Sequence, residues 1–557
     1  MLSRMSRMEI ACASGLFALA LSATLLVPID PRPQPNNTSA PPVNARAAAD
    51  KVAPAFASGF SPGPGAVFCF AEGTPVDYIE AIERMYPAGT SVGLPEGGAD
   101  PRYQFSDGSR WPGGQGNPRA LTWSFVPDGL IADGQASELF VNLDADFGGD
   151  RALWISRIAS CFGRWAQLGG VTYTRVTDVG VDWDDGAAWG STGNGTTRGD
   201  IRIAMIPQDG TNNVLAYNYF PNSANGGDMV LDSDEGWGST FNLHRFLRNI
   251  IMHEHGHGLG FSHVCPGNHT KIMEPLLNTG FDGPRQDDIR VVQRGYGDIR
   301  EPDNTPAQAF DLGAITPATP ITDHCMVPLP LDGPQALIAA TCSIDADGEV
   351  DHFKFNVAVA SNVTITLTPK GNTYDSVPGS SSSCPSGGTI NAAAIANLNV
   401  DLIGTDGTTI LATAASQAAG VAETLVDVPL TGSPGTFYIK VHESSAFTQS
   451  QLYTISVSVE DALVDCNSNL IADSSDISSG TSLDCNSNLV PDDCEFPGCP
   501  GILAGDLDCS STHNGLDVPR WVNVYVGSEY TCQADIDQDG DVDLVDADLL
   551  ADLLLGP

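Results

Sequence analysis

The pattern of apolar and polar residues changes three times along the chain. Residues 28–65 show no sustained period, whereas between about 102 and 296 short apolar runs such as 121–126 and 201–206 alternate with amphipathic stretches such as 152–168. After residue 301, Thr, Val and Ile runs are separated by Gly, Pro and Asp, and beyond 461 the apolar content falls. This pattern predicts a lead-in, a mixed α/β or α+β region, an all-β sandwich and a small tail. The tail is too polar to bury a large core, so metal ions or disulfides would have to stabilise it.

The N-terminal residues have the pattern of an export signal. Arg4 and Arg7 precede an apolar stretch at residues 10–27, so residues 1–27 are expected to be a secretory signal. Cleavage is expected, and the alternative is retention as a membrane anchor. Residues 28–99, rich in Pro, Ala, Asn and Ser at their start, are expected to be a flexible lead-in or propeptide.

A dense set of ionisable residues lies at 253–263, which reads HEHGHGLGFSH. On a helix His253 and His257 share one face, so their imidazoles can bind one Zn²⁺. Gly260 would end the helix in a left-handed turn and return the chain so that His263 becomes a third ligand. Three protein ligands leave one position for water, which is a catalytic rather than a structural arrangement.

The general base of such a site is Glu254, which follows His253 and can face the open position. Zinc lowers the pKa of bound water to about 7, so Glu254 can accept its proton and later protonate the leaving amine of a peptide. The alternative interpretation is an amphipathic helix with surface histidines. His255 and His269 are expected to be exposed or hydrogen-bonded side chains and not ligands.

The same segment resembles the HExxHxxGxxH motif of metzincins, and residues 100–300 are similar to the matrixin branch of that family. The resemblance implies an α+β endopeptidase domain with a twisted mixed sheet and an active-site helix. It implies that Met273 lies in a turn beneath the metal and that Pro275 shapes the wall of the S1′ pocket. Leu215 and Ala216 would belong to the edge strand that holds an extended substrate.

The chain departs from the matrixin pattern at two points. Tyr217 and Val230 stand where the family's structural zinc needs histidines, so only the catalytic zinc is expected. Cys69 lacks the PRCG-like context of the cysteine that keeps matrixins latent, so a disulfide is its expected state. A calcium site, with a solvated acidic turn as the alternative, is implied by the resemblance for Asp228, Asp232 and Glu235.

The remaining regions carry further resemblances. Residues 305–460 resemble the bacterial pre-peptidase C-terminal domain around 351–355, and any other sandwich, including a carbohydrate-binding module, is the alternative. Residues 461–500 hold two twelve-residue units that resemble thrombospondin type-3 repeats, with oxygen side chains at positions suited to Ca²⁺. The candidate ligands are Asp465, Asn467, Asn469, Asp473 and Asp476 in the first unit, and Asp484, Asn486, Asn488, Asp492 and Glu495 in the second.

Residues 501–557 contain an EF-hand-type loop followed by an apolar, helix-like segment at 549–555. Its candidate ligands are Asp535, Asp537, Asp539, Asp541, Asp543 and Asp546. A second loop lacks the glycine at position 6 and is expected to bind calcium more weakly, through Asp506, Asp508, Ser510, Asn514 and Asp517. The pair resembles a dockerin, which implies a scaffold or cell-surface partner, and a purely structural tail is the alternative.

Composition narrows the range of partners. The net charge of −42 in 557 residues repels nucleic acid and anionic membranes and suits cations. Thirteen cysteines in an exported chain favour disulfides. We therefore expect a secreted, zinc-dependent endopeptidase of extracellular proteins, with several structural calcium ions, no nucleic-acid partner and no membrane contact beyond the signal. The alternative is a calcium-stabilised adhesion or scaffold protein with a degenerate protease domain.

Overall fold

The computed structural model describes residues 54–87, 110–264, 269–328, 338–359, 361–375, 388–444, 449–461, 473–479, 491, 504–507, 510, 512–527, 533–537 and 541–556. The described residues all belong to one compact unit that spans 52–557. The expected signal peptide at 1–27 lies outside the described residues. Among those that are described, no helix combines the length and the apolar character needed to cross a bilayer.

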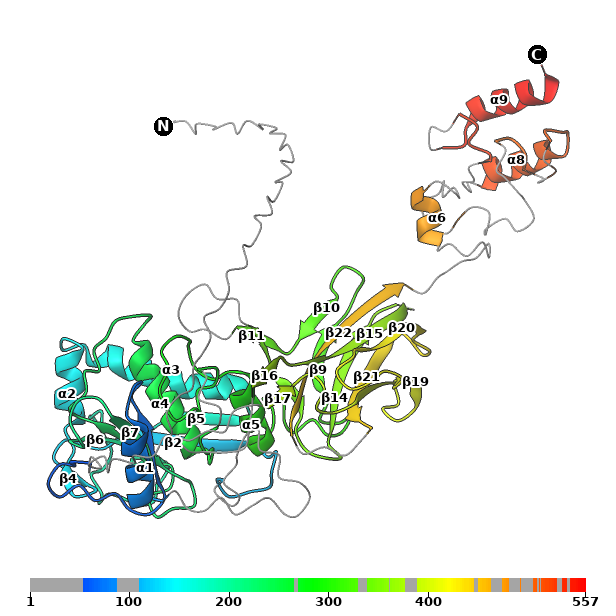
Figure 1. Ribbon diagram of the computed structural model, residues 1–557. Coiled ribbons are helices and arrows are strands. Elements are labelled where there is room, and N and C mark those ends of the chain that lie inside the picture. Colours follow the sequence, from blue (N-terminus) through cyan, green and yellow to red (C-terminus); the bar gives the residue numbers. More distant parts are fainter. Residues whose placement is uncertain are drawn as a thin grey trace, which may run out of the picture. The chain divides into compact units, whose positions relative to one another are not determined.

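The N-terminal half is built on a six-stranded mixed sheet with the order β1-β7-β8-β6-β2-β5 (Figure 1). Strands β5, β2, β6 and β8 run parallel to one another, whereas β7 is antiparallel to β8 and β1 is antiparallel to β7. The strands are β1 (Ala66–Phe70), β2 (Arg119–Phe125), β5 (Val171–Arg175), β6 (Ile201–Ile206), β7 (Val214–Tyr219) and β8 (Met229–Asp232), and a small hairpin joins β3 (Ile131–Ala132) to β4 (Gln135–Ala136).

Helices cover both faces of this sheet. Along β6 the side chains alternate, so that Ile203 and Met205 join one core and Ala204 and Ile206 join the other. The first core is shared with α3 and α4, and the second with α1. The helices are α1 (Val76–Met85), α2 (Leu139–Asp146), α3 (Arg151–Leu168), α4 (Arg245–Gly258) and α5 (Gln286–Tyr296).

Within the predicted flexible lead-in of residues 28–99, the described part at 54–87 contains the ordered elements β1 and α1, which corrects the expectation for these residues alone. The run VFCF at 67–70 is continuously apolar, and all five residues of β1 are buried. The amphipathic helix α1 buries Tyr78, Ile79 and Ile82. Burial of these apolar side chains compensates the entropy lost on ordering the segment.

The aromatic core under α3 gives a direct test of how the catalytic half is held together. Trp154 is fully buried, lies 5.0 Å from the Phe125 ring and donates from Nε1 to Asp144 over 3.0 Å. We expect Trp154→Ala to lower the free energy of unfolding by about 3–5 kcal/mol, because it leaves a cavity. Val179→Ala, at a side chain that is 91% exposed, should change it by less than about 0.5 kcal/mol. Denaturant unfolding measures both.

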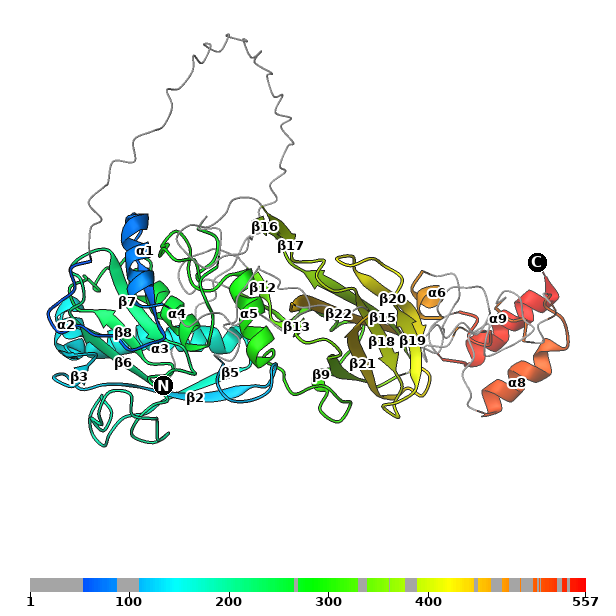
Figure 2. The ribbon, with the colours of Figure 1, turned by 60° about the horizontal axis from the view of Figure 1, so that its bottom comes forward.

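The region after residue 310 is rich in strands, as expected. One sheet has the order β10-β22-β15-β20 with β13 also paired to β22, and the other has the order β19-β18-β21-β14-β9. Side chains from both sheets form a common core, and every second residue of β15 is buried. Figure 2 labels strands of both sheets. The strands are β9 (Phe310–Ala314), β10 (Ile321–His324), β11 (Met326–Pro328), β12 (Ile338–Ala340), β13 (Cys342–Ile344), β14 (Val350–Val357), β15 (Ser361–Lys370), β16 (Thr373–Asp375), β17 (Thr389–Asn391), β18 (Leu398–Ile403), β19 (Ile410–Ala414), β20 (Glu423–Pro429), β21 (Gly435–Glu443) and β22 (Gln451–Asp461).

The tail contains α6 (Asp473–Ser479), α8 (Asp517–Gly527) and α9 (Leu544–Leu555). Trp521, Ala534 and Leu550 form its small core. Stabilisation of the tail by metal ions or disulfides stays a prediction.

The cysteines are only partly described. A disulfide joins Cys325 to Cys342, which confirms that the chain carries a disulfide, whereas Cys69 and Cys161 are buried free thiols. The expected disulfide at Cys69 is therefore wrong, because this thiol lies against the active-site helix. Outside the described residues are Cys265, Cys384, Cys466, Cys485, Cys494, Cys499, Cys509 and Cys532.

Candidate active site

The central feature of the site is the buried helix α4, which is anchored at both ends. Near its start, Arg248 forms a buried ion pair of 2.6 Å with Asp282. At its end, Trp111 donates from Nε1 to the Gly258 carbonyl over 2.9 Å, and the Tyr296 hydroxyl donates to the Leu259 carbonyl over 2.7 Å. These contacts fix the direction in which the helix presents its side chains.

The three candidate zinc ligands converge at the end of this helix. Their Nε2 atoms are 3.1 Å apart for His257 and His253, 3.2 Å for His257 and His263, and 3.3 Å for His253 and His263. Gly260 has φ of +97°, so the chain turns back where the spacing predicted. Ligand nitrogens about 2.0–2.1 Å from a tetrahedral zinc ion are separated by about 3.3–3.4 Å. The residues present therefore fit a zinc ion.

The other ring nitrogens fix the tautomers of two of these histidines. His253 Nδ1 lies 2.6 Å from the Ile272 carbonyl, and His257 Nδ1 lies 2.6 Å from the Phe261 carbonyl. Because a carbonyl can only accept, each Nδ1 carries the proton and each Nε2 keeps its lone pair. Burial lowers the pKa of His253 to about 4 and holds the pKa values of His257 and His263 well below their usual value. The imidazoles are neutral at pH 7, which is the form that binds metal.

Glu254 is fully buried beside these rings. In the described part of the chain its carboxylate has no polar partner other than the Cys69 thiol. Burial raises the pKa of Glu254 well above its usual value. A carboxyl group that is shielded from solvent and has no competing hydrogen-bond partners is suited to exchange a proton with a reacting molecule.

The turn after the third histidine supports the site from below. Gly256 of α4 packs closely against this turn, because a Cβ at this position would lie 2.3 Å from the Met273 sulfur. The Asp288 carboxylate of α5 accepts hydrogen bonds from the backbone N–H groups of Ile272, at 3.0 Å, and Met273, at 3.3 Å. The sequence pattern did not predict this positioning role of Asp288.

His255 lies on another face of α4 and takes no part in the cluster. Its Nε2 is 2.6 Å from the Tyr173 hydroxyl, and its ring packs against Phe162. His269 is exposed. Both histidines thus have the hydrogen-bonded or exposed environments that were expected.

The predicted substrate strand is already paired. Leu215 and Ala216 lie on β7, but β1 occupies its outer edge, with Cys69 opposite Ala216. The Phe70 carbonyl accepts from the Leu277 N–H over 2.9 Å, next to the buried Pro275 of the predicted S1′ wall. The expectation that β7 is the free edge of the sheet is therefore corrected.

This pairing brings Cys69 to the active site. Its sulfur, a ring nitrogen of His253 and a carboxylate oxygen of Glu254 all lie within 4.8 Å of one another. Burial and then the charge of Glu254 raise the pKa of the thiol well above its usual value, so it is protonated at pH 7. The N-terminal segment thus pairs β1 with β7 and places the Cys69 thiol beside His253 and Glu254.

The predicted calcium residues of the catalytic half do not form one set. Asp228 precedes β8 and Asp232 ends it, so about 13 Å of strand separates them. Asp228 accepts from the Arg202 N–H over 2.8 Å, whereas Asp232 accepts from the Gln208 N–H over 3.2 Å. Glu235 accepts from the Asn212 N–H. Asp232 and Glu235 therefore face the turn at 208–213, and Asp228 is excluded from their site.

The tail loops are described in part. Asp535, Asp537 and Asp546 each bring a carboxylate oxygen within 4.8 Å of the others. Asp543 is the N-cap residue of α9. Asp541 lies in the same loop. In the other loop, Asp506 accepts from the Ser510 N–H over 3.0 Å and Asp517 from the Asn514 N–H over 2.7 Å. Asp473 and Asp476 are buried in α6. Outside the described residues lie Asp465, Asn467, Asn469, Asp484, Asn486, Asn488, Asp492, Glu495, Asp508 and Asp539.

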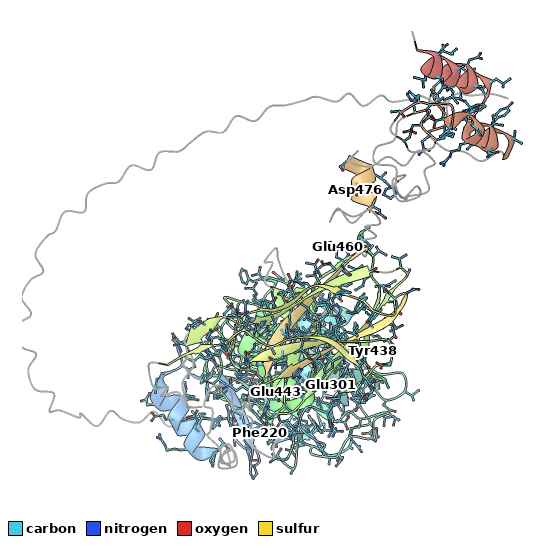
Figure 3. The ribbon with its side chains drawn as sticks, turned by 90° about the vertical axis from the view of Figure 1, so that its right-hand side faces the viewer. Phe220, Glu301, Tyr438, Glu443, Glu460 and Asp476 are labelled. Atoms are coloured by element: carbon cyan, nitrogen blue, oxygen red, sulfur yellow. A yellow bond between two sulfur atoms is a disulfide. The ribbon has the colours of Figure 1, made fainter. Side chains whose placement is uncertain are left out.

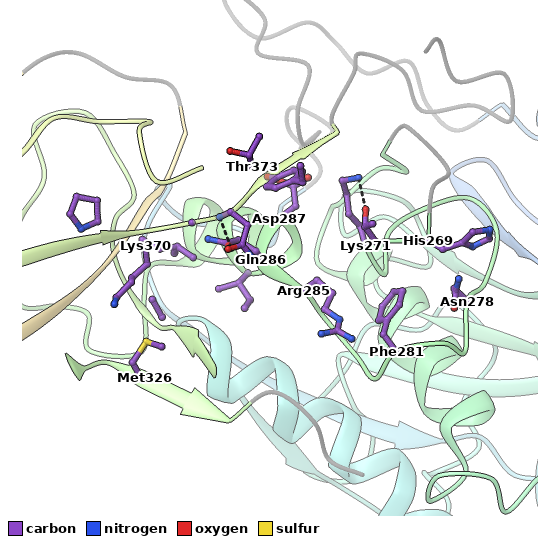
Figure 4. A pocket seen from close by; sticks show the side chains of 18 of the residues that line it. His269, Lys271, Asn278, Phe281, Arg285, Gln286, Asp287, Met326, Lys370 and Thr373 are labelled. Carbon is purple, nitrogen blue, oxygen red and sulfur yellow. Dashed lines mark hydrogen bonds between the residues drawn. The ribbon is translucent and has the colours of Figure 1, made fainter. Parts of the chain in front are cut away.

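A pocket of about 680 Å³ opens beside the catalytic half (Figure 4). Lys271, Phe281 and Arg285 line it from one side, and Lys370 and Thr373 line it from the β-rich region. None of the three converging histidines lines this pocket. It is therefore distinct from the site described above.

Comparison with known proteins agrees with this geometry. Residues 151–297 match the family model described as Matrixin. Matrix metalloproteinase-15 of Homo sapiens is 38% identical over 117 residues, which are 20% of this chain and 17% of that protein. Interstitial collagenase of Equus caballus is 32% identical over 146 residues, 26% of this chain and 28% of that protein. Stromelysin-3 of Xenopus laevis is 26% identical over 163 residues, 28% of this chain and 31% of that protein.

The chain thus spans less than a third of the length of these relatives. The match covers α3, β5 to β8, α4 and α5, and it includes all three converging histidines and Glu254. Residues 151–297 are therefore similar to the matrixin family and to part of these metalloproteinases.

Proposed function

We propose that the protein is a secreted zinc-dependent endopeptidase that hydrolyses extracellular proteins, with His253, His257 and His263 as zinc ligands and Glu254 as general base. The observation that carries this proposal is the convergence of three neutral Nε2 atoms within 3.3 Å of one another. A buried carboxylate without a competing cation lies beside them. A structural histidine cluster would not need that carboxylate.

The chain's own residues account for most of the reaction. When bound, zinc supplies a Lewis acid that polarises the peptide carbonyl and makes water more acidic. Glu254 accepts the proton of the attacking water at a carboxylate oxygen and delivers it to the departing amine nitrogen. The carbonyls of Ile272 and Phe261 keep the ligand rings oriented. β7, once freed of β1, would hold the substrate through main-chain hydrogen bonds.

Zinc content tests the ligand assignment. We expect one zinc per chain and no second structural zinc, because Tyr217 and Val230 are buried core residues and Tyr217 donates to Asp133 over 2.8 Å. His263→Ala should weaken zinc binding by more than the roughly 10–100-fold that loss of an outer-shell partner costs. Elemental analysis and activity after chelation measure both, and added zinc should restore the activity.

His269→Ala is the matched control, since this histidine is exposed. It should keep both the zinc and the activity. Full zinc content in the His263→Ala variant would contradict the assignment.

We also propose that residues before about 100 act as a propeptide. β1 occupies the edge of β7 that a substrate would need, and Cys69 lies against Glu254. Latency would therefore combine strand pairing with a buried thiol, although Cys69 lacks the sequence context familiar from matrixins. Release of the segment would open the cleft.

The C-terminal regions are proposed to localise the enzyme. Calcium in the repeats of residues 461–500 and in the loops of residues 501–557 would stabilise a tail with a very small core. A dockerin-like tail would bind a scaffold or cell-surface partner. The second candidate function, an adhesion or scaffold protein with a degenerate protease, is disfavoured because none of the four catalytic groups is missing.

A further inference from the structure

A second buried cluster of carboxylates lies far along the chain from the histidines, where the segment after α5 meets the β-rich region. One oxygen each of Glu301, Asp345 and Glu349 lie within 4.8 Å of one another, and the same holds for Glu301, Asp303 and Asp351. Glu301 belongs to both triads and is labelled in Figure 3. Five carboxylates therefore converge on one small volume.

Three of these carboxylates, Asp303, Asp345 and Asp351, are buried, and most of their oxygens lack a hydrogen-bond partner. Tyr453 donates to Asp351 Oδ2, and backbone N–H groups donate to Glu349. Asp303 and Asp351 are 1% exposed and Asp345 is 0% exposed. Both side-chain oxygens of Asp303 and of Asp345, and Oδ1 of Asp351, have no hydrogen-bond donor. Buried polar oxygens are almost always satisfied in native proteins, so these unpaired oxygens indicate that a positively charged ligand belongs between them.

The basic side chains near the cluster provide too little positive charge to neutralise its five carboxylates. Arg300 is the nearest cation on the same segment, but its guanidinium stacks 5.1 Å above the Phe310 ring, and its Nε and Nη1 are buried without an acceptor. Arg294 donates to the Asp345 backbone carbonyl and not to its carboxylate. Burial, followed by repulsion from Asp298 and Glu301, raises the pKa of Asp303 to about 8. Ionised carboxylates in this cluster therefore destabilise the folded chain when no cation is bound between them.

We propose that this cluster binds calcium, with Glu301, Asp303, Asp345, Glu349 and Asp351 as its ligands. Neither triad contains a nitrogen or sulfur donor, which disfavours zinc. A set of several carboxylates on two loops suits Ca²⁺, which accepts six to eight oxygen ligands in flexible geometry, whereas Mg²⁺ demands a strict octahedron and keeps most of its water. Sharing of Glu301 between the triads allows a second ion to be bridged by this residue.

The position of the site gives it a structural consequence. Gly297 accepts from the Gly170 N–H over 2.7 Å within the catalytic half, and Asp298 accepts from the Ser343 N–H of β13 over 3.1 Å. Gln293 of α5 donates to the Thr341 carbonyl over 3.2 Å. Calcium bound by residues 301–303 and 345–351 would lock the segment that leaves the catalytic half onto the first strands of the β-rich region.

Hydrogen exchange of the full chain tests the proposal. Mass spectrometry on peptides covering 296–309 and 343–353 reports calcium binding at this cluster separately from calcium binding in the tail. With calcium at about ten times its dissociation constant, opening of these peptides should slow by about tenfold relative to chelator. The double variant D303N/D345N should lose this response. D347N is the matched control, because Asp347 is exposed in the same loop, and it should keep the response.

Two further readouts separate loss of binding from misfolding and from other cations. Without calcium, D303N/D345N should melt at the same or a higher temperature than the parent chain, because repulsion is removed; a lower melting temperature would contradict the proposal. Equal exchange with and without calcium in the parent chain, while the tail peptides respond, would overturn it. An equal response to Mg²⁺ at the same concentration would overturn the calcium assignment.

Discussion

Glu254→Ala is expected to reduce kcat for protein cleavage by about 10²–10⁴-fold while the zinc stays bound. Glu254 contributes no ring nitrogen to the cluster, so the three imidazoles keep their separations of 3.1–3.3 Å. The variant loses only the group that moves the proton between water and the leaving amine. Steady-state kinetics on a denatured protein, with zinc content measured on the same sample, separates catalysis from metal binding.

Glu138→Ala is a suitable control, since Glu138 is an exposed glutamate of the same domain. It should leave kcat unchanged. Removal of the buried Glu254 carboxylate should not lower the melting temperature, because its burial is unfavourable in the ionised form. If Glu254→Ala kept more than about a tenth of the activity, the assigned base would be wrong.

The geometry of the histidine cluster could be predicted because every step is local. Helix periodicity places His253 and His257 on one face, and Gly260 adopts the positive φ that the turn requires. Only the return of His263 depends on a short loop. Spacing within eleven residues therefore contained most of the information about the cluster.

The residues that sequence reasoning missed are joined by tertiary contacts. Cys69 meets Glu254 across 185 positions of sequence, and Asp288 supports Met273 from the next helix. The apolar run at 67–70 could have indicated a buried strand, but nothing local shows that this strand pairs with β7. The same holds for Asp303 and Asp345, which show no loop spacing typical of calcium sites. Their cluster forms only when β13 pairs with β22 and β14 pairs with β9 and β21 in the β-rich fold.

The grouping of Asp228 with Asp232 failed for a geometric reason. The two residues are close in sequence and both acidic, but an extended strand separates residues by about 3.3 Å each. Clustering in sequence predicts a shared ion only where the backbone turns. The tail residues Asp535, Asp537 and Asp546 show the contrast, because their loop brings the three carboxylates together.

Release of the N-terminal segment is expected to raise kcat/KM of the full chain by about 10²–10³-fold. β1 pairs with β7 as a tethered strand, and a short tether gives an effective concentration in the millimolar range that free substrate cannot match. A site for a specific protease, placed between residues 90 and 105, allows the tether to be cut after folding. Activity on a short peptide substrate is compared before cutting and after removal of the released segment by gel filtration.

Cys69→Ala in the uncut chain separates the thiol from the strand. We expect a rise of only about tenfold, corresponding to one hydrogen bond to a charged group, because the backbone pairing remains. The freed enzyme should also melt at a lower temperature, since Phe68, Phe70 and Ile79 no longer cover Tyr217 and Val230. If the cut chain lost the segment and gained no activity, β1 would be a permanent part of the sheet and substrate would have to bind elsewhere.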